Sequence, residues 1–311
     1  MRDDVRVTTA SRPAAAPDAP EMELNRIGLV VHPTRDIETA LDSAREWARA
    51  SGAQIVQISV SDDERVVADR GDIDDCDLVL AVGGDGTTLH ALRAAAEAGR
   101  AVLGVSCGSL GALTAVNAED VRDALERVAA GEWVPRRLPG LRVAADGVPD
   151  RTAINDLVVV RAGASQVLVE ILVDGQRYVR YAGDGLVVAT PVGSSAYTLA
   201  AGGPVLAEAS DGLVLTPLAP HGGCCPPLVV SSGSELRVLV EPGYAGARLE
   251  FDGQVVEGPP PELRLTREED HATLVGLHDG EPLLAGLRRR RILIDSPRVL
   301  ARDDRALLGP A

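Results

Sequence analysis

Apolar residues follow two alternating patterns over the first part of the chain. Ile27 to Val31 is a continuous apolar run, as in a buried strand. After Asp36 the apolar residues recur every three or four positions, which is the spacing of one helix face. These residues are Ile37, Ala40, Leu41, Ala44, Trp47 and Ala48. With Gly52 as its stop, the pattern predicts a helix between two strands, the second at Ile55 to Val60.

The alternation continues to about residue 133. Asp77 to Val82 is an apolar run that leads into a glycine-rich segment, and a helix is predicted from about Thr88 to Ala98. Ala101 to Val105 is the next predicted strand, and Asn117 is placed to cap a helix that reaches Gly131. Strands alternating with helices are typical of a parallel, doubly wound α/β sheet.

Beyond Trp133 the helical spacing fades, and short Val-rich strands separated by turn residues replace it. The predicted strands cover residues 141–145, 154–161, 167–173, 177–181, 186–189, 228–230, 236–240 and 248–251. Asp174-Gly175, between two of them, is typical of a β-hairpin. Strands at this spacing predict a β-sandwich-like domain.

The chain is therefore expected to have four parts. Residues 1–24 are predicted to be a disordered leader, and 25–133 an α/β phosphate-binding domain. Residues 134–290 are predicted to form a β-rich substrate-binding domain. Residues 291–311 are expected to return to the first domain.

Composition narrows the possible functions. Acidic residues outnumber basic ones 46 to 31, giving a net charge of −15, which disfavours nucleic acid and anionic membrane as partners. The one basic run, residues 288–291, is interpreted as a solvated face. No apolar stretch has the length of a membrane span, and the N-terminus lacks the apolar core of a signal peptide. Four cysteines without paired spacing indicate reduced thiols in a cytoplasmic protein rather than a zinc site.

The glycine-rich segment, residues 83–87, carries the clearest chemistry. Gly83, Gly84, Gly86 and Thr87 lie between a predicted strand and a predicted helix, where backbone N–H groups can approach a phosphate. Asp85 among them suits a group that accepts a proton from a substrate hydroxyl or helps to hold Mg²⁺. The alternative is a tight turn, in which Gly-Asp-Gly is common.

Several blocks of the sequence, in order, resemble those of the NAD kinase family. The glycine loop is the first, and the match covers roughly residues 25 to 290. The fourth block, Gly183 to Tyr197, is long and specific. The others are Gly104–Gly111, Ala153–Asp156, Ala201–Pro204, Thr216–His221 and Asp252–Gln254.

The resemblance implies a kinase that transfers the terminal phosphate of ATP, or of polyphosphate, to the adenosine-ribose 2′-hydroxyl of NAD, yielding NADP. Mg²⁺ or another divalent cation would assist. Asp85 would activate the hydroxyl, and Asn155 and Asp156 would hold the adenosine. Thr190, Ser195, Ala196 and Tyr197 would line the dinucleotide site. Asp184 would contact the far end of the substrate across a subunit interface, since the family forms homodimers and homotetramers.

The chain departs from the family pattern where the substrate is expected. Ser106 stands where the family usually has Asn, and Ala112 where it usually has an aromatic residue. Val192 replaces a usual Thr or Ser, and Ala200 replaces a usual Ser. The segment around Pro226 lacks a usual Arg. Asp156 stands in place of the commoner Glu. The phosphate loop is intact and the pocket is altered, so the sequence supports phosphoryl transfer more strongly than NAD as the substrate.

Other interpretations stay open from the sequence. A kinase of this family that acts on a nucleoside, a polyol or a specialised metabolite is one, and a non-catalytic nucleotide sensor is another. A dehydrogenase is disfavoured because His32-Pro33-Thr34 lacks the glycine fingerprint of such enzymes. The donor (ATP or polyphosphate), the acceptor (NAD or NADH) and the oligomeric state are not specified.

Overall fold

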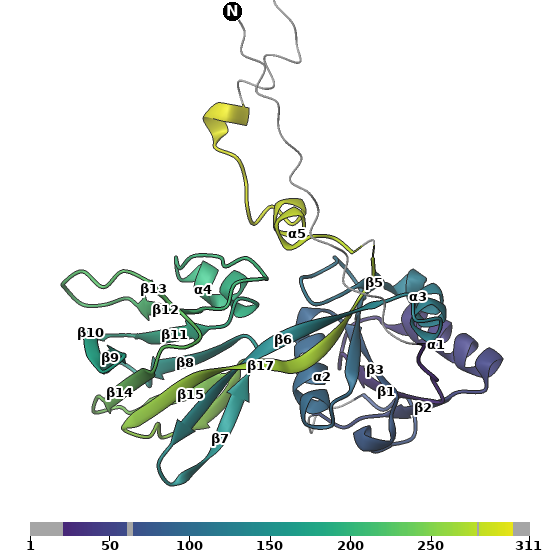
Figure 1. Ribbon diagram of the computed structural model, residues 1–311, viewed down its shortest axis with the longest axis horizontal. Helices are drawn as coiled ribbons and strands as arrows, with labels where there is room; N and C mark the ends of the chain where they lie inside the picture. The colour runs from purple at the N-terminus through teal and green to yellow at the C-terminus, as the bar shows by residue number, and fades with distance from the viewer. Residues whose placement is uncertain (1–20, 61–64, 279, 301–311) are drawn as a thin grey trace, which may run out of the picture.

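The computed structural model describes residues 21–60, 65–278 and 280–300 (Figure 1). The chain forms two halves, and long strands run from one to the other. Residues 1–20 of the expected leader, and residues 301–311 of the expected C-terminal segment, lie outside the described part.

The first half alternates strands and helices, as the sequence predicts. Strands β2, β1, β3 and β4 lie side by side in this order, all parallel. The elements are β1 (Arg26–Val31), α1 (Glu38–Ser51), β2 (Gln54–Gln57), η1 (Ile73–Asp75), β3 (Leu78–Gly83), α2 (Asp85–Glu97), β4 (Ala101–Ser106), β5 (Val116–Asn117), η2 (Ala118–Asp120) and α3 (Val121–Ala129).

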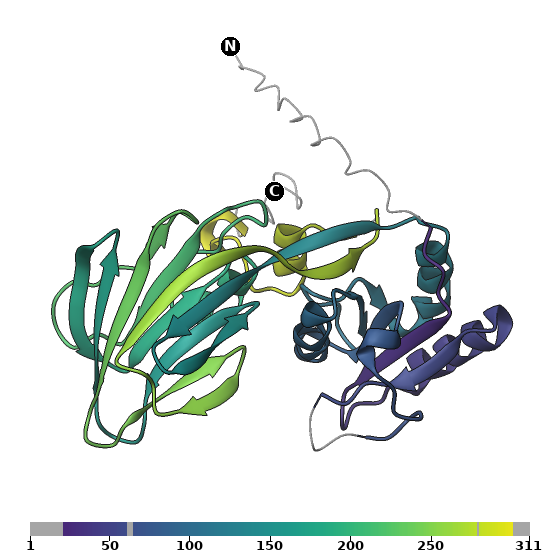
Figure 2. The same cartoon turned by 60° about the horizontal axis from the view of Figure 1, so that its bottom comes forward.

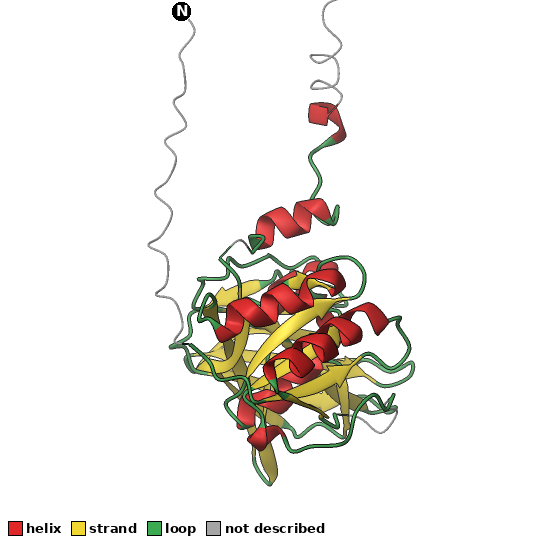
Figure 3. Cartoon of the chain, turned by 90° about the vertical axis from the view of Figure 1, so that its right-hand side faces the viewer, coloured by secondary structure: helices red, strands yellow, loops and turns green. Residues whose placement is uncertain are grey.

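Alternate strand residues point to opposite faces of this sheet. Leu78 and Leu80 of β3 pack in one apolar cluster with α1 and α3, whereas Val79 and Ala81 pack with α2 on the other face. Figure 3 shows the helices around the strands of this half. The α/β class expected from the sequence is confirmed.

Two helix starts differ from the sequence prediction. Helix α2 begins at Asp85 rather than near Thr88, so Asp85 belongs to the first helical turn. Asn117 lies in β5 and makes no side-chain cap, because a short 3₁₀ turn separates it from α3. The Asp36 carboxylate does accept a hydrogen bond from the Glu38 amide, at 3.2 Å, at the start of α1.

The second half consists mainly of β-strands in two layers. Its elements are β6 (Val134–Ala145), β7 (Val148–Ala153), β8 (Asp156–Arg161), β9 (Val167–Val173), β10 (Gln176–Gly183), β11 (Gly185–Ala189), η3 (Gly193–Ser195), α4 (Tyr197–Ala200), β12 (Leu213–Leu218), β13 (Leu228–Val230), β14 (Leu236–Pro242), β15 (Ala247–Phe251), β16 (Gln254–Glu257) and β17 (Glu262–Gly276). A six-stranded antiparallel sheet, β13-β12-β11-β8-β15-β16, forms one layer. Its inward residues share an apolar core with β6, β9, β14 and β17.

The larger sheet continues from one half into the other. Strand β17 pairs with β6 along most of its length, and its end pairs in parallel with β4, where Thr273 lies opposite Ala101. Figure 2 shows both strands crossing between the halves. The chain thus re-enters the first half through β17, before the segment in which the sequence analysis placed its return.

Helix α5 (Leu283–Arg289) follows β17 and lies above the junction of the halves (Figure 1). Leu287 is fully buried and anchors it. Among the described residues, no helix combines the length and the apolar character needed to cross a bilayer.

Candidate functional site

The glycine loop joins the buried strand β3 to α2. A side chain at Gly83 would collide with Thr87, and one at Gly84 would lie 3.1 Å from the guanidinium of Arg35. Arg35 also donates to the Gly83 carbonyl at 3.3 Å. The loop is therefore closely packed on one side and carries a cation beside its backbone, which suits an anionic ligand.

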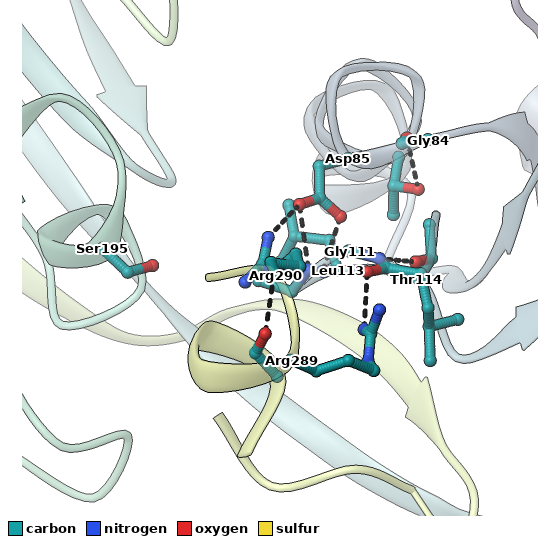
Figure 4. Close-up of polar contacts among 12 residues, drawn as sticks. Gly84, Asp85, Gly111, Leu113, Thr114, Ser195, Arg289 and Arg290 are labelled. Carbon is teal, nitrogen blue, oxygen red and sulfur yellow. Dashed lines mark hydrogen bonds and ion pairs between the residues drawn. The ribbon is translucent and has the colours of Figure 1, made fainter. Parts of the chain in front are cut away.

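The Asp85 carboxylate is held by the loop that follows β4. One carboxylate oxygen accepts a hydrogen bond from the Ala112 amide at 2.9 Å, and the other accepts one from the Leu113 amide, also at 2.9 Å. Figure 4 shows these contacts and the guanidinium of Arg290, whose Nη1 lies 3.7 Å from the carboxylate. The side chain remains 37% exposed, so it is fixed in orientation and still accessible to a substrate.

Gly111 makes this arrangement possible. A Cβ atom at this position would overlap the Asp85 carboxylate. The Gly111 amide donates to the Thr114 hydroxyl at 2.7 Å, which fixes the turn that presents the next two amides. The sequence resemblance covers Gly111, but the reason for a glycine here is visible only in three dimensions.

We expect Gly111→Ala to displace the Asp85 carboxylate and so to lower the phosphoryl-transfer activity that the sequence resemblance implies by about 10²-fold, because such an activity depends on placement to within a fraction of an ångström. The measurement is steady-state kcat, with thermal unfolding as a check on folding. Gly108→Ala is the matched control, since a Cβ there meets only the Arg35 side chain at 3.7 Å. Equal activity of the two variants would contradict this role of Gly111.

Two cavities adjoin the glycine loop. One, of about 370 Å³, is lined by residues 84–87 together with His32, Arg35 and His90. The other, of about 490 Å³, shares His90 and Val60 with the first and extends to Arg93 of α2 and Arg151 of β7. Burial, and then the Arg93 charge, lower the pKa of His90. The two cavities together form an elongated space along α2, between the halves.

Asn155, Thr190 and Ser195 come together at one end of the six-stranded sheet. The Thr190 hydroxyl donates to the Ile154 carbonyl at 2.6 Å, and the Thr190 amide donates to the Asn155 carbonyl at 2.9 Å. Ser195 donates to the Val192 carbonyl at 3.3 Å. The side-chain oxygen of Asn155 is buried and has no partner among the described residues, which makes it an unsatisfied acceptor of this region.

Asp252 is a residue of this region to which the sequence analysis gave no role. Its buried carboxylate accepts hydrogen bonds from the amides of Ile154, Asn155 and Asp156, at 2.9, 2.7 and 3.2 Å. Burial is the largest influence on this carboxyl and raises its pKa, against the opposing effects of the three amides and of Arg93. One side chain thus fixes the start of the strand that follows Asn155, and it is influenced by the charge of Arg93, in helix α2 of the first half.

Asp156 does not reach solvent freely. It is 6% exposed, and burial, followed by the charges of Asp252 and Glu250, raises its pKa to about 7. The expected role of its carboxylate in holding adenosine therefore applies to a group that is partly protonated near neutral pH.

Because the folded carboxyl of Asp156 keeps its proton up to about pH 7 and the unfolded one does not, native stability falls as pH rises through this range. We expect Asp156→Asn to lack this loss, so that its stability relative to the natural chain improves by about 2–3 kcal/mol between pH 5 and pH 8. Urea unfolding across this range tests the prediction, with the exposed Asp123→Asn as control. Parallel pH profiles for the natural chain and Asp156→Asn would contradict it.

Asp184 and Tyr197 lie elsewhere, in a hollow of about 470 Å³ that shares no lining residue with the cavities along α2. The Asp184 carboxylate accepts a hydrogen bond from the Nε of Arg161 at 2.6 Å, and Tyr197 is 42% exposed. Ala196 is exposed beside it. The structure therefore brings the predicted residues together in three groups, around Asp85, around Asn155 and around Asp184.

Two further findings concern residues singled out from the sequence. Interpreting residues 288–291 wholly as a solvated face was wrong, because the Arg290 side chain is 19% exposed and points to Asp85. Charge alone did not reveal this, since the contact joins residues far apart in the chain. Ser106, one of the departures from the family pattern, has a buried hydroxyl without a partner among the described residues.

Comparisons with known proteins agree with this geometry. The family model for the ATP-NAD kinase N-terminal domain matches residues 27–133, and that for the ATP-NAD kinase C-terminal domain matches residues 154–268. The NAD kinase of Heliobacterium modesticaldum is 39% identical over 183 residues, which are 57% of this chain and 65% of that protein, just under two thirds of its length. The NAD kinase of Desulforamulus reducens is 32% identical over 243 residues, or 74% of this chain and 84% of the relative.

Solved structures give the same result. An NAD kinase from Archaeoglobus fulgidus in complex with ATP superposes with a TM-score of 0.64 and 26% identity, covering 86% of this chain and 96% of that one. Yeast NADH kinase complexed with NADH has a TM-score of 0.72 at 19% identity, covering 88% and 89%, and supports the fold alone. With both domain models matched in order over the two halves, the chain belongs to the ATP-NAD kinase family.

Proposed function

We propose that this chain transfers the terminal phosphate of ATP to the adenosine-ribose 2′-hydroxyl of NAD, giving NADP. The observation that carries the proposal is the Asp85 carboxylate, held by two backbone amides beside a glycine loop and still accessible. Family membership supports the same activity.

Asp85 is placed to act on the acceptor. Each of its oxygens accepts one amide hydrogen bond, which leaves a second lone pair on each for a substrate hydroxyl. As the hydroxyl oxygen attacks phosphorus, its proton passes to this carboxylate. The amides fix the carboxylate before the substrate arrives, so no reorientation is needed during the reaction.

The glycine loop and Arg35 suit the phosphates of the donor. Gly84 leaves the backbone open beside the Arg35 guanidinium, and the N-terminus of α2, a helix of 13 residues, faces the same cavity. Guanidinium and helix N-terminus both favour negative charge. Gly83, Gly86 and Thr87 complete this proposed phosphate site.

The residues present fit a divalent cation that arrives with the donor. Mg²⁺ in kinases is commonly held by one or two carboxylates together with substrate phosphates, and Asp85 is the carboxylate in the glycine loop. Among the described residues, no three His, Cys, Asp or Glu side chains are arranged as a metal site. When bound, Mg²⁺ would neutralise the charge of the phosphates, and Asp85 would hold the cation together with the nucleotide.

The dinucleotide is proposed to occupy the second half. The unpartnered Asn155 oxygen suits the amino group of an adenine, with Asp156, Thr190 and Ser195 around it. The hollow at Asp184 and Tyr197, with Ala196 next to Tyr197 in the chain, suits the far end of a dinucleotide held across a subunit interface, so a homodimer or homotetramer is the proposed form. The cytoplasm is its proposed location.

A second candidate is a kinase of the same family with another hydroxyl acceptor. The observation in its favour is a cavity of about 190 Å³ beside Ala112, where the family usually carries an aromatic side chain. A missing ring enlarges the space near Asp85 and could change which acceptor fits.

The test is an acceptor and donor panel. The purified chain is mixed with Mg²⁺, with ATP or polyphosphate as the donor, and with NAD, NADH, nucleosides or polyols as the acceptor, and products are identified by mass. NADP formed from NAD and ATP at a rate above every other acceptor supports the proposal. Faster phosphorylation of a nucleoside or polyol would favour the second candidate, and no product from a folded sample would remove both.

A further inference from the structure

Arg290, at the C-terminal end of α5, is the nearest cation to Asp85 that the structure provides. Its Nη1 lies 3.7 Å from the same Asp85 oxygen that accepts the Ala112 amide. The side chain is 19% exposed, whereas Arg288 on the same helix is 57% exposed and pairs with Asp295. Figure 4 shows Arg290 between the carboxylate and the body of α5.

The helix is anchored without the help of Arg290. Arg289 pairs with Glu281 at 2.8 Å and donates to the Leu110 carbonyl at 2.8 Å, and Leu287 is fully buried. Leu110 belongs to the loop that also carries the Ala112 and Leu113 amides, which bind the Asp85 carboxylate. Arg289 therefore binds helix α5 to the loop that follows β4, while Arg290 extends toward the Asp85 carboxylate.

The guanidinium of Arg290 is oriented but not fully engaged. Its Nε donates to the Gly286 carbonyl at 3.2 Å, which sets the direction of the side chain. The 3.7 Å separation from Asp85 is longer than a hydrogen bond, and within the described residues the terminal nitrogens make no hydrogen bond. Arg290 also lines the 190 Å³ cavity beside Ala112, so there is space next to it.

A cation held this close to a proton-accepting carboxylate lies where acceptor and phosphoryl group must meet. The transferred phosphoryl carries negative charge on three oxygens, and arginine N–H groups bind such oxygens well. An arginine whose purpose was to pair with Asp85 would be expected to make a close, bidentate contact. The observed distance leaves its donors available to a third group.

We propose that Arg290 contacts the phosphoryl group during transfer and stabilises its charge, a catalytic role for the residue that ends helix α5, which rests on the proposed kinase activity. The acceptor oxygen forms a bond to the terminal phosphorus while the bond from that phosphorus to the bridging oxygen breaks, and its electron pair leaves with ADP. The acceptor proton moves to Asp85. Arg290 changes no bond and donates hydrogen bonds to the phosphoryl oxygens throughout.

The test compares Arg290→Gln, Arg290→Lys and Arg290→Ala with the natural chain. We expect Arg290→Gln to lower kcat by about 10²–10³-fold, with KM for NAD nearly unchanged, as for loss of one donor to a developing charge. Arg290→Lys should recover part of this loss, and added guanidinium ion should raise the activity of Arg290→Ala. By calorimetry, Arg290→Ala should bind ATP more weakly and ADP as the natural chain does, since ADP lacks the group contacted.

Arg288→Gln is the matched control, because its side chain lies on the same helix and pairs away from the site. Unchanged kcat in Arg290→Gln would overturn the inference. So would a loss that guanidinium does not rescue and that weakens ADP and ATP equally, because this result indicates a structural role. If the natural chain phosphorylates no acceptor, the proposed function fails first; if it is active and Arg290→Gln matches it, the inference about Arg290 alone fails.

Discussion

Replacing Asp85 by Asn should lower kcat by about 10³-fold or more and leave a folded protein. The amide of Asn has nearly the same shape but cannot take the hydroxyl proton, so the loss falls on the chemical step. The backbone amide of Ala112 or of Leu113 would also face the NH₂ group of Asn instead of an oxygen. This unfavourable contact between two donors costs about 1–3 kcal/mol of unfolding free energy if it is not relieved. Steady-state kinetics and thermal unfolding measure the two effects.

Asp123→Asn is the control for this variant, since that carboxylate is exposed in the first turn of α3, a helix that packs in a different apolar cluster from α2. We expect it to retain full activity. An Asp85→Asn protein with more than a tenth of the natural kcat would show that the carboxylate is not the proton acceptor. A folded Asp85→Asn protein that still binds ATP and NAD but does not turn over would agree with the proposed role.

The largest effect on stability is expected at Asp252. Asp252→Ala removes the acceptor of three amide hydrogen bonds, two of them from buried residues, and places Ala at a φ of 50°. Orphaned amides and left-handed backbone together should cost about 3–5 kcal/mol of unfolding free energy. Urea denaturation measures this loss, and NAD affinity should fall with it because Asn155 is no longer held.

A second hairpin supplies the matched control. Asp174 has nearly the same φ, 51°, and is also followed by Gly, but its carboxylate accepts a single amide, from exposed Glu235 at 2.9 Å. Asp174→Ala therefore carries the same backbone cost with fewer lost hydrogen bonds and should destabilise by about 1–2 kcal/mol. If both variants lose equal stability, the three amides of Asp252 contribute little.

The sequence was sufficient for features that depend on local pattern. The apolar spacing after Asp36 predicted α1, the alternating strands predicted a parallel sheet, and Asp174-Gly175 predicted the turn between β9 and β10. Each follows from residues that are neighbours in the chain or on one face of one element. The glycine loop was found for the same reason.

Features that depend on distant contacts were not predicted. The continuous sheet arises because β17 pairs with both β6 and β4, and no local pattern specifies which strands pair. The amides that hold Asp85 come from a loop 27 and 28 residues further along the chain, and every residue type except proline supplies a backbone N–H group. Arg290 lies more than 200 residues after Asp85 in the chain, so the basic run that contains it was interpreted as a solvated face.

The position of the new phosphate in the product tests the central claim most directly. The purified chain is incubated with ATP, Mg²⁺ and NAD, and the product is characterised by mass and phosphorus NMR. A single phosphate added to the 2′-oxygen of the adenosine ribose is the predicted result. Phosphate on a different hydroxyl, or recovery of unchanged NAD from an active and folded preparation, would contradict it.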